Sequence, residues 1–570
     1  MPLYYRGITL LSTVNKVYSA VVNTRNVSAL ESNDILVDEQ NGFRRKRSCN
    51  DHLFKLTTII RNRKRKKLAT FLAFVDFEKA FDRVDRALLL HKLGKLGLGP
   101  KILSSISNIY SSCQSCVILN RHLTESFPSQ VGVRQGDTLS PTLFNIYIND
   151  LAECLNNSRK GIKLNESLEV TSLFYADDLV IMAETNENLQ SLLNILHKWC
   201  QQWRMSINIG KTKVIHFRNK TQVRSNFTFK VGNANIEMTD KYKYLGLILD
   251  EHLDFSNTAS FIAGSAGRAL GAVCTKFSQM KGMGYNTYTK LYETGVAPIL
   301  DYGSDIWGFQ KFSQISAIQN RAIRFFLGTH RFASNVAVNG DMGWTSCETR
   351  RHIAMLRFWN RVIGMEDDRL TKKIFMWDYQ ERRSVGSWNS DVFKIFDKIG
   401  KLDIYQNRCM INIQHAKTIL KSLDKHVWSE NVEQLPKLRF YRRFKFSNEC
   451  DPYVYKVSNR AHRSIMAQLR SGVLPLRVET GRFTQIPLEF RLCIFCESNN
   501  IEDEVHFIFE CSLYDNIRRR FFDKLQQFHP SWPNLNVDQK LLLLMSKEFV
   551  KDTAEFVHQC FVTRRKQIYQ

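Results

Sequence analysis

The chain has 570 residues, of which 44% are hydrophobic and 12% aromatic, and it carries a net charge of +26. This composition excludes a disordered chain, and the length predicts more than one domain, each with its own core. The charge predicts a polyanionic partner, for which nucleic acid is the best candidate.

The 13 cysteines lack the short spacing of secreted disulfide frameworks, which favours a reducing compartment with mostly buried thiols. Residues 1–6 do not have the pattern of a signal peptide. Since no apolar run approaches about 18 residues, we expect no membrane span. We therefore expect a nuclear or cytoplasmic protein that is not secreted.

A basic cluster, Arg61–Lys67, is the first unusual segment along the chain. Three interpretations are open for it: a nuclear-import signal, a patch that contacts a nucleic-acid template, or a solvated helix end. The apolar run Phe71–Val75 follows and predicts a buried strand, which ends at Asp76. Because an unpaired buried charge is costly, packing does not explain an acid at this point.

Two further apolar runs, Val170–Phe174 and Leu179–Ala183, predict strands joined by the tight turn Tyr175-Ala176-Asp177-Asp178. The turn presents two adjacent carboxylates, which repel each other unless a cation neutralises them. Mg²⁺ is the hard, oxygen-preferring cation that fits. With Asp76 the pair gives three carboxylates from two strands, a set that can hold two Mg²⁺ ions for a phosphoryl transfer.

From about residue 256 the pattern becomes helical, with small residues recurring through Ala259–Phe277 and apolar residues at helical spacing in Ile315–Leu327. A second acidic pair, Asp367-Asp368, has no strand-like flanks, and we interpret it as a solvated turn. In Lys437–Phe446 basic and aromatic residues alternate. This mixture suits single-stranded nucleic acid, and it equally suits an amphipathic element with buried aromatic rings and solvated arginines.

Four potential metal ligands lie close together near the C-terminus, with the spacing C-x2-C-x9-H-x4-C: Cys493, Cys496, His506 and Cys511. Such a set predicts a tetrahedral structural zinc site. The alternative is a group of buried thiols with a packed histidine. No open coordination position is implied, so we expect a role in folding or in gripping nucleic acid. Arg518-Arg519-Arg520 follows and is a candidate for holding phosphates.

Several motifs in this order resemble those of the reverse transcriptases of non-LTR (LINE-type) retrotransposons, over residues 5 to about 520. The fingers motifs of this family are similar to Tyr5–Ser12 and Asn41–Arg44, and its palm motifs are similar to Asp76–Asp82, Arg134–Pro141 and Tyr175–Asp178. The motifs that close the palm are similar to Asn208–Lys213 and Tyr244–Gly246, and the C-terminal knuckle is similar to Arg491–Cys511.

The resemblance implies an α+β right-hand polymerase, in which a palm of antiparallel strands and helices is followed by a mainly helical region with a small zinc knuckle. The implied domains are fingers and palm at 1–255, a helical thumb at 256–370, a helical and basic linker region at 371–480, a CCHC zinc-knuckle-like module at 481–525 and a helical tail at 526–570.

The resemblance also implies the chemistry. Asp76 and Asp177 would bridge two Mg²⁺ ions, with Mn²⁺ as a substitute, while Asp178 would be more peripheral. The backbone carbonyl of Phe77 would be a further ligand. The reaction would be attack of a primer 3′-hydroxyl on the α-phosphate of a dNTP, with catalysis mainly by positioning and charge stabilisation.

Two residues are expected at the sugar and base of the nucleotide. An aromatic ring at Phe81 would clash with a 2′-hydroxyl and so select dNTPs, although a plain core position is the alternative. Gln135 would hydrogen-bond the incoming nucleotide, and Gly136 would let the backbone approach it closely.

Basic residues are expected at the phosphates. Arg44, and with less support Arg6, would bind the triphosphate, since a guanidinium matches phosphate oxygens. Lys211 would hold or protonate the leaving pyrophosphate, and Lys213 is its rival for that role.

The implied partners are an RNA template, a DNA primer or target, and dNTPs. Because the chain starts almost inside the fingers, has Gly7 where the family has Pro, and contains no endonuclease or ribonuclease H pattern, we expect an N-terminally truncated reading frame. An endonuclease would then be supplied elsewhere. The alternative function is a catalytically inactive, nucleic-acid-binding remnant that keeps the positive charge and the zinc knuckle.

Overall fold

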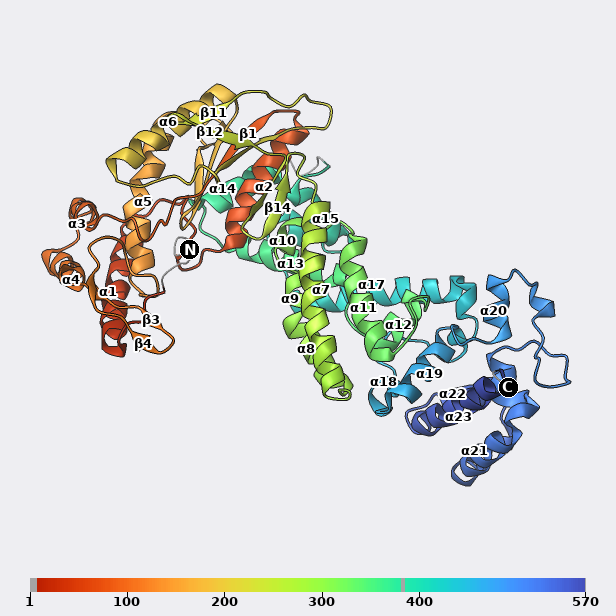
Figure 1. Ribbon diagram of the computed structural model, residues 1–570. Helices are drawn as coiled ribbons and strands as arrows, with labels where there is room; N and C mark the ends of the chain where they lie inside the picture. The colour runs from red at the N-terminus through yellow and green to blue at the C-terminus, as the bar shows by residue number, and fades with distance from the viewer. Residues whose placement is uncertain (1–7, 381–384, 569–570) are drawn as a thin grey trace. The chain divides into compact units, whose positions relative to one another are not determined.

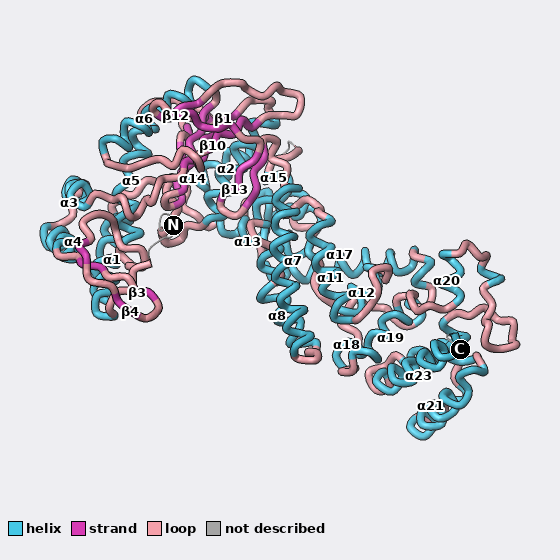
Figure 2. Tube along the Cα trace, viewed as in Figure 1, coloured by secondary structure: helices cyan, strands magenta, loops and turns pink. Residues whose placement is uncertain are grey.

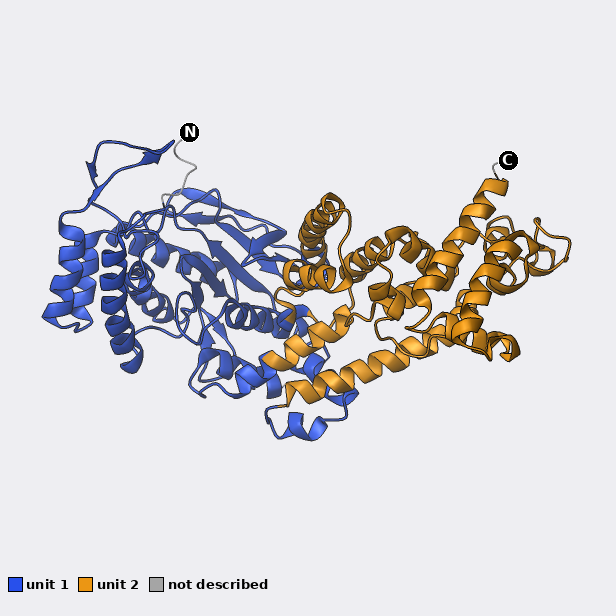
Figure 3. Cartoon of the chain, turned by 90° about the horizontal axis from the view of Figure 1, so that it is seen from below, with its two compact units in different colours: residues 1–258, 305–307, 358–410 blue, residues 259–304, 308–357, 411–570 orange. Residues whose placement is uncertain are grey.

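The computed structural model describes residues 8–380 and 385–568. The chain forms two compact units that alternate along the sequence and are coloured separately in Figure 3. Unit 1 comprises Met1–Thr258, Asp305–Trp307 and Phe358–Met410, and unit 2 comprises Ala259–Ser304, Gly308–Arg357 and Ile411–Gln570. Among the described residues, we find no helix with the length and apolar character needed to cross a membrane.

Unit 1 contains a six-stranded sheet with the order β11-β12-β10-β1-β9-β8, in which only the β10–β12 pair is parallel. Figure 2 shows that the strands gather in this part of the chain. Its strands are β1 Thr70–Val75, β8 Ser172–Tyr175, β9 Asp178–Ala183, β10 Lys213–Phe217, β11 Phe229–Val231 and β12 Ala234–Met238. The remaining strands form two-stranded pairs: β2 Gln114–Ser115 with β5 Phe127–Pro128, β3 Ile118–Leu119 with β4 His122–Leu123, β6 Ile162–Lys163 with β7 Glu169–Val170, and β13 Lys241–Tyr244 with β14 Leu247–Asp250.

Strand β1 lies inside the sheet, between β10 and β9. All six of its residues are buried, since other parts of the chain pack on both of its faces. Phe71, Ala73 and Val75 share one hydrophobic core with α5 and α6. On the opposite face Phe74 stacks on Tyr242 of β13, with ring centroids 4.9 Å apart. The predicted buried strand before Asp76 is therefore confirmed.

Six helices accompany the strands of unit 1 in the first part of the described chain (Figure 1). They are α1 Thr13–Ser32, α2 Cys49–Arg65, α3 Arg86–Lys95, α4 Pro100–Ser111, α5 Ser140–Asn156 and α6 Asn186–Gln202. Helix α5 starts at Ser140-Pro141, where its proline occupies the first turn. Asp85 caps α3 and accepts hydrogen bonds from the backbone N–H groups of Ala87 and Leu88.

Helix α2 is buried along most of its length because a later segment of the chain returns to cover it. This segment holds the end of α13 Cys347–Ile363, then α14 Leu370–Gln380, α15 Trp388–Lys398 and α16 Leu402–Gln406. Phe54 of α2 packs between Phe358 and Trp388, at 5.1 Å from each ring centroid. Arg361 forms an ion pair with Asp51 at 2.7 Å. The acidic pair Asp367-Asp368 lies in an exposed turn of the same segment, as predicted.

Three residues of the basic cluster at the end of α2 make contacts within unit 1, while Lys66 and Lys67 are exposed. Arg63 is buried, and its guanidinium pairs with Glu184 at 2.8 Å. Arg61 pairs with Asp391 at 3.4 Å, and the ammonium of Lys64 donates to the carbonyl of His252. The arginines therefore hold unit 1 together, whereas a solvated helix end would leave them in water.

Unit 2 is helical, apart from its loops. Its helices are α8 Tyr285–Gly295, α9 Ala297–Leu300, α11 Ser313–Leu327, α12 Asn335–Met342, α17 Ile413–Gln434, α18 Pro452–Lys456, α19 Arg460–Arg470, α20 Arg477–Phe483, α21 Asp515–Phe528, α22 Val537–Leu544, α23 Val550–Ile568 and most of α7 Ser256–Gln279, while α10 Ser304–Trp307 lies at a boundary between the units. The helical periodicity of Ala259–Phe277 and Ile315–Leu327 thus corresponds to α7 and α11.

A buried ion network lies at the centre of unit 2. The guanidinium of Arg470 contacts Asp341 at 2.8 Å and Asp451 at 2.5 Å, and its side chain has no exposed surface. The hydroxyls of Tyr441 and Tyr453 donate to the same Asp341 carboxylate, at 3.0 and 2.8 Å. Because each charge is paired and hydrogen-bonded, the network meets the condition under which buried ions are tolerated.

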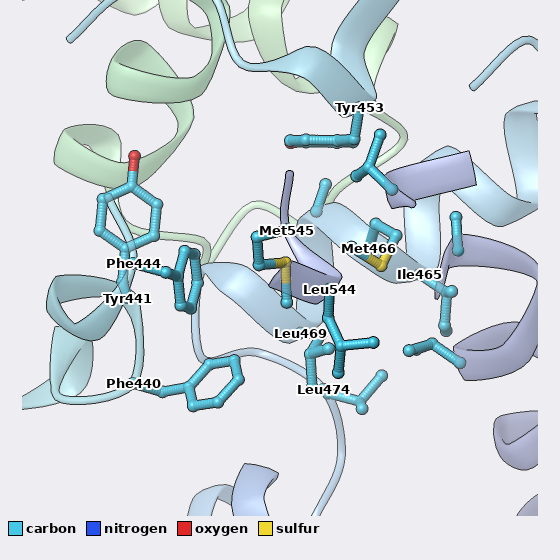
Figure 4. Close-up of a cluster of buried hydrophobic side chains, with 14 of the residues drawn as sticks. Phe440, Tyr441, Phe444, Tyr453, Ile465, Met466, Leu469, Leu474, Leu544 and Met545 are labelled. Atoms are coloured by element: carbon cyan, nitrogen blue, oxygen red, sulfur yellow. The ribbon is translucent and has the colours of Figure 1, made fainter. Parts of the chain in front are cut away.

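The basic and aromatic segment 437–446 contributes mainly to this core. Phe440, Tyr441 and Phe444 are buried in the cluster shown in Figure 4, and only Phe446 remains largely exposed. Arg439 pairs with Glu504 and Arg443 with Asp538. Of the two interpretations, the structure favours the amphipathic element with buried rings. Its arginines differ from that interpretation in that they form ion pairs, although they remain partly exposed.

Candidate active site

The acidic turn forms as predicted. Strands β8 and β9 make an antiparallel hairpin in which Tyr175 pairs with Asp178, so that Ala176 and Asp177 form a two-residue turn. On its other side β9 pairs with β1, and Val75 of β1 lies opposite Leu179 of β9. Asp76 and Asp178 lie directly beside this pair on neighbouring strands. The three carboxylates therefore lie together at one end of these strands, although Asp76 and the acidic turn are about a hundred residues apart in the sequence.

A cavity of about 690 Å³ opens beside these acids. Most of the predicted site residues line it, namely Asp76, Phe77, Phe81, Gln135, Gly136, Asp177 and Lys211. Phe43, Arg134 and Asn208 also contribute to its wall. Asp178 and Arg44 are not among the lining residues. Residues from several distant motifs thus share one concave site, as an active site requires.

The charges at the cavity distinguish the two candidate lysines. The ammonium of Lys211 lies 3.8 Å from Asp76 Oδ2 and its side chain is 63% exposed. Lys213 instead pairs with Glu237 at 2.7 Å. Lys211 is therefore the lysine that faces the cavity.

The carboxylates also affect the tyrosines behind them. Burial, followed by the negative charge of Asp178, raises the pKa of Tyr244 well above its usual value. Burial, Asp76 and Asp178 likewise raise the pKa of Tyr242. Burial is the larger cause of both shifts, and the carboxylates at this end of the strands add to it.

Phe81 belongs to the core on one side and to the cavity on the other. Its ring stacks on Phe144, with centroids 4.7 Å apart and an interplanar angle of 13°. Phe43 meets it edge-on at 6.3 Å. The half-buried ring is thus held in a fixed orientation while it lines the cavity.

Gly136 has a backbone conformation with φ of 106°, which favours glycine. A Cβ atom there would lie 2.7 Å from the carbonyl oxygen of Thr9. The neighbouring Gln135 carbonyl accepts a hydrogen bond from Thr9 N–H at 2.8 Å. The backbone of Thr9 therefore approaches Gly136 too closely for a side chain at this position. This contact within the chain is separate from the predicted approach of a nucleotide.

Arg44 is placed away from the cavity lining. Its guanidinium pairs with Glu31 of α1 at 2.6 Å and donates to the carbonyl of Val37 at 2.7 Å. Burial alone would raise the pKa of Glu31, but the Arg44 guanidinium holds it below its usual value. A role for Arg44 in triphosphate binding would require this pair to open. Arg6, the weaker candidate, lies outside the described residues.

Gln40, which no sequence pattern selects, lies against the acidic turn. Gln40 is buried and hydrogen-bonds the backbone of Ala176. The only signal for it was its position directly before Asn41–Arg44, and an isolated glutamine next to a motif has no distinctive pattern of its own.

The Cys and His cluster also assembles as its spacing predicts. The ligand atoms of Cys493, Cys496, His506 and Cys511 all lie within 4.8 Å of one another. The Cys493 and Cys511 sulfurs are 3.8 Å apart, and Cys496 Sγ is 3.4 Å from His506 Nε2. Two sulfurs bound to one tetrahedral zinc at about 2.3 Å each would be separated by roughly 3.8 Å, so the arrangement fits this ion.

The surroundings of this cluster hold its ligands in place. His506 Nδ1 lies 3.1 Å from a carboxylate oxygen of Glu510, a contact that can fix the ring orientation of a metal-binding histidine. Arg518 is buried and donates to the carbonyls of Ile508 and Cys511. Of the three consecutive arginines, only Arg519 and Arg520 are exposed and available to phosphates.

The chain was compared with known proteins. Residues 3–249 match the family described as reverse transcriptase (RNA-dependent DNA polymerase). A probable RNA-directed DNA polymerase from transposon BS of Drosophila melanogaster is 26% identical over 358 residues, covering 61% of this chain and 39% of that protein. The RNA-directed DNA polymerase from mobile element jockey of Drosophila funebris is 26% identical over 321 residues, covering 55% of this chain and 34% of that protein. This chain thus spans about two fifths or less of the length of these relatives.

Among solved structures, apo telomerase from Candida tropicalis is 13% identical and covers 70% of this chain and 60% of its own, with a TM-score of 0.34. Similarity at this level supports no argument about function. The sequence matches are the stronger finding, and with them the predicted resemblance to the polymerases of non-LTR retrotransposons is confirmed. Residues 3–249 of the chain are thus similar to the reverse transcriptase family.

Proposed function

We propose that this chain is an RNA-directed DNA polymerase of a non-LTR retrotransposon, which extends a DNA primer with dNTPs on an RNA template. The main support is the convergence of Asp76, Asp177 and Asp178, with Asp76 and Asp177 lining one cavity. In this proposal residues 1–255 supply the fingers and palm of a right-hand polymerase. The helices from residue 256 to 370 supply its thumb.

The carboxylate set fits a divalent metal site. Asp76, Asp177 and Asp178 would hold two Mg²⁺ ions, or Mn²⁺ in their place, since carboxylate oxygens are the ligands these hard cations prefer. When bound, the ions would activate the primer hydroxyl and stabilise the leaving oxygen. The placement of Asp76 and Asp178 opposite each other on neighbouring strands, with Asp177 in the adjoining turn, supports a cation at this place.

The other cavity residues would bind and orient the nucleotide. Phe81 would lie under the sugar, and Gln135 would hydrogen-bond the nucleotide beside Gly136. The ammonium of Lys211 would meet the pyrophosphate, since its contact with Asp76 is long and its side chain is largely exposed. Together these groups would fix the reacting atoms in place, which can supply much of the rate enhancement.

The direct test compares the wild type with Asp177→Asn in Mg²⁺-dependent dNTP incorporation on a primed RNA template. The substitution keeps the size of the side chain but removes a charged ligand, so we expect incorporation to fall by a factor of about 10³ or more. RNA binding, measured in parallel by fluorescence anisotropy, should stay within about twofold because most affinity comes from phosphate contacts.

The alternative is a catalytically inactive protein that only binds nucleic acid. It would give no incorporation by either form, with RNA binding retained. Asp367→Asn is the matched control, because Asp367 is an exposed acid of the second acidic pair and lies outside this cavity. Its incorporation should equal that of the wild type.

We further propose that Cys493, Cys496, His506 and Cys511 form a structural zinc site, which makes this segment a small zinc knuckle. The support is the fit of the sulfur separation and the contact between His506 and Glu510. With four protein ligands no position remains for a substrate, so the site would stabilise the fold and present Arg519 and Arg520 to phosphates.

A further inference from the structure

We propose that Gln40 is a positioning residue of the polymerase site, which acts by holding the acidic turn in the geometry that metal binding and nucleotide transfer require. This inference rests on the proposed polymerase function. It assigns a task to a side chain that touches neither the cavity nor the carboxylates themselves.

Both the oxygen and the NH₂ group of the Gln40 amide form hydrogen bonds with the backbone of the turn. Its Oε1 accepts hydrogen bonds from the N–H of Ala176 at 2.9 Å and from the N–H of Gly42 at 2.7 Å. Its Nε2 donates to the carbonyl of Ala176 at 3.3 Å. The side chain is only 2% exposed, so water does not compete for these groups. A buried amide that is satisfied on both sides has one favoured orientation.

The glutamine amide has the length and the polar groups to make all three bonds at any pH at which the protein is folded. The site offers two N–H donors on one side and one carbonyl acceptor on the other, which matches the oxygen and the NH₂ group of glutamine. A deprotonated glutamate could accept from the two N–H groups but could not donate to Ala176. Asparagine is one methylene shorter, and methionine has nearly the same length but lacks both polar groups.

The turn needs external support because its backbone is unfavourable for the residue that occupies it. Ala176 has φ of 56°, in the left-handed region that costs free energy for residues with a Cβ. Such a conformation persists only when its surroundings hold it. The hydrogen bonds from Gln40 reach the N–H and the carbonyl of this same residue.

Close backbone contact makes the support rigid. A Cβ atom at Gly42 would lie 2.1 Å from the backbone nitrogen of Ala176, so the two segments touch directly. Asn41 N–H donates to the carbonyl of Phe174 at 2.9 Å, and Phe174 N–H donates to the carbonyl of Glu39 at 3.0 Å. Asn145 of α5 binds the carbonyl of Gly42 at 2.8 Å. The strand-like segment 39–42 therefore lies alongside β8 and ends at the turn.

The consequence for the site follows from the position of Ala176 in the sequence. It directly precedes Asp177 and lies two residues before Asp178, so a rotation of its peptide groups would displace both carboxylates relative to Asp76. A metal site is sensitive to such displacements, and loss of an outer contact of this kind typically costs about 10- to 100-fold in metal affinity or activity.

The experiment measures steady-state dNTP incorporation by the full chain with Gln40→Met and with the wild type. We expect kcat to fall by about 10- to 100-fold and the Mg²⁺ concentration for half-maximal rate to rise severalfold. The KM for dNTP should stay within about twofold, because the nucleotide contacts themselves are unchanged.

Gln190→Met is the matched control. Gln190 also binds both the N–H and the carbonyl of one backbone residue, Lys230 of β11 in the same unit, but it lies outside the cavity lining. Both variants remove side-chain hydrogen bonds to the backbone of unit 1, so each should lower the thermal unfolding midpoint, with the larger decrease for the buried Gln40. Only Gln40→Met should alter kcat and the Mg²⁺ dependence.

A second variant, Gln40→Glu, adds a signature that general destabilisation would not produce. A protonated glutamic acid can both accept and donate, as the amide does, whereas the carboxylate cannot donate. The activity of Gln40→Glu relative to the wild type should therefore rise as the pH is lowered, since burial favours the neutral form.

The outcomes separate the two proposals. An inactive wild type would refute the proposed polymerase function. An active wild type with unchanged kcat and Mg²⁺ dependence in Gln40→Met would overturn the positioning role alone. Equal losses of activity in Gln40→Met and Gln190→Met would also overturn it, because they would show a purely structural effect.

Discussion

The Phe81 ring is held between Phe144 and Phe43 while it lines the cavity, and this arrangement gives a test of sugar selection. Replacing it by valine should open space where a 2′-hydroxyl would lie. We expect the preference for dNTPs over rNTPs, measured as the ratio of their kcat/KM values, to fall by about tenfold or more.

Phe144→Leu serves as the control for this prediction. It removes the stacking partner of Phe81 but leaves the ring that lines the cavity. Its sugar preference should remain close to that of the wild type. An equal loss of preference in both variants would mean that Phe81 is only a core residue.

At the level of single residues, the sequence predicts groups whose role depends on a local pattern. Asp76 at a strand end and Asp177 in a hairpin turn follow from the strands that surround them. Arg44 does not, because its pairing with Glu31 depends on how α1 packs. Gln40 was missed for the same reason, since its partner in the acidic turn is separated from it by 136 residues.

The cysteine and histidine module can be tested by metal removal. We expect one zinc ion per chain by elemental analysis, and none after Cys511→Ser combined with mild chelation. Since binding of structural zinc contributes directly to folding, the loss should destabilise unit 2 by several kcal/mol in thermal or urea unfolding.

Cys560→Ser is the control for the zinc prediction. Cys560 is a buried thiol of the same unit but does not belong to the cluster. This variant should keep its zinc even if packing is disturbed. If the wild type instead contained no zinc after purification without chelators, the alternative of buried thiols with a packed histidine would be correct.

At the level of secondary-structure elements, some sequence patterns predict one structure and others are compatible with two. The hairpin around Asp177 was predictable because alternating apolar runs and a short polar turn favour little else. The alternation in Lys437–Phe446 fits nucleic acid and a protein core equally. Partners far along the chain, such as Asp538 for Arg443, settle the outcome, and no local pattern encodes them.

For the whole molecule, the charge of +26 predicts strong dependence of nucleic-acid binding on salt. Each phosphate contact releases counterions, so affinity falls with rising salt concentration. We expect the affinity for single-stranded RNA to fall by about a hundredfold or more between about 50 mM and about 200 mM salt. Titrations followed by fluorescence anisotropy would measure the slope.

Two charge-matched variants refine this prediction. Replacing Arg519 and Arg520 together by glutamine should reduce the slope by up to about 1.4 if both contact phosphates. Replacing the exposed Arg565 and Lys566 removes the same charge elsewhere in unit 2 and should change the slope less. Equal changes in both would mean that net charge, without a phosphate site at the knuckle, determines binding.

The length of the chain predicts more than one domain, and the structure confirms this with two compact units. Their interleaving could not be predicted. Nothing in the composition of residues 358–410 indicates that they pack on α2, because the contacts that hold them, such as that between Arg361 and Asp51, join positions 310 residues apart.

The covering of α2 by this late segment has a consequence for synthesis. When residue 258 leaves the ribosome, the sheet of unit 1 is complete in sequence, but Phe54 still lacks Phe358 and Trp388 as neighbours. Roughly 150 further residues must follow, which takes about 8–30 s at ordinary elongation rates. During this interval the apolar side chains of α2 that this segment will cover, such as Phe54, remain exposed on the nascent chain, where a chaperone could bind them.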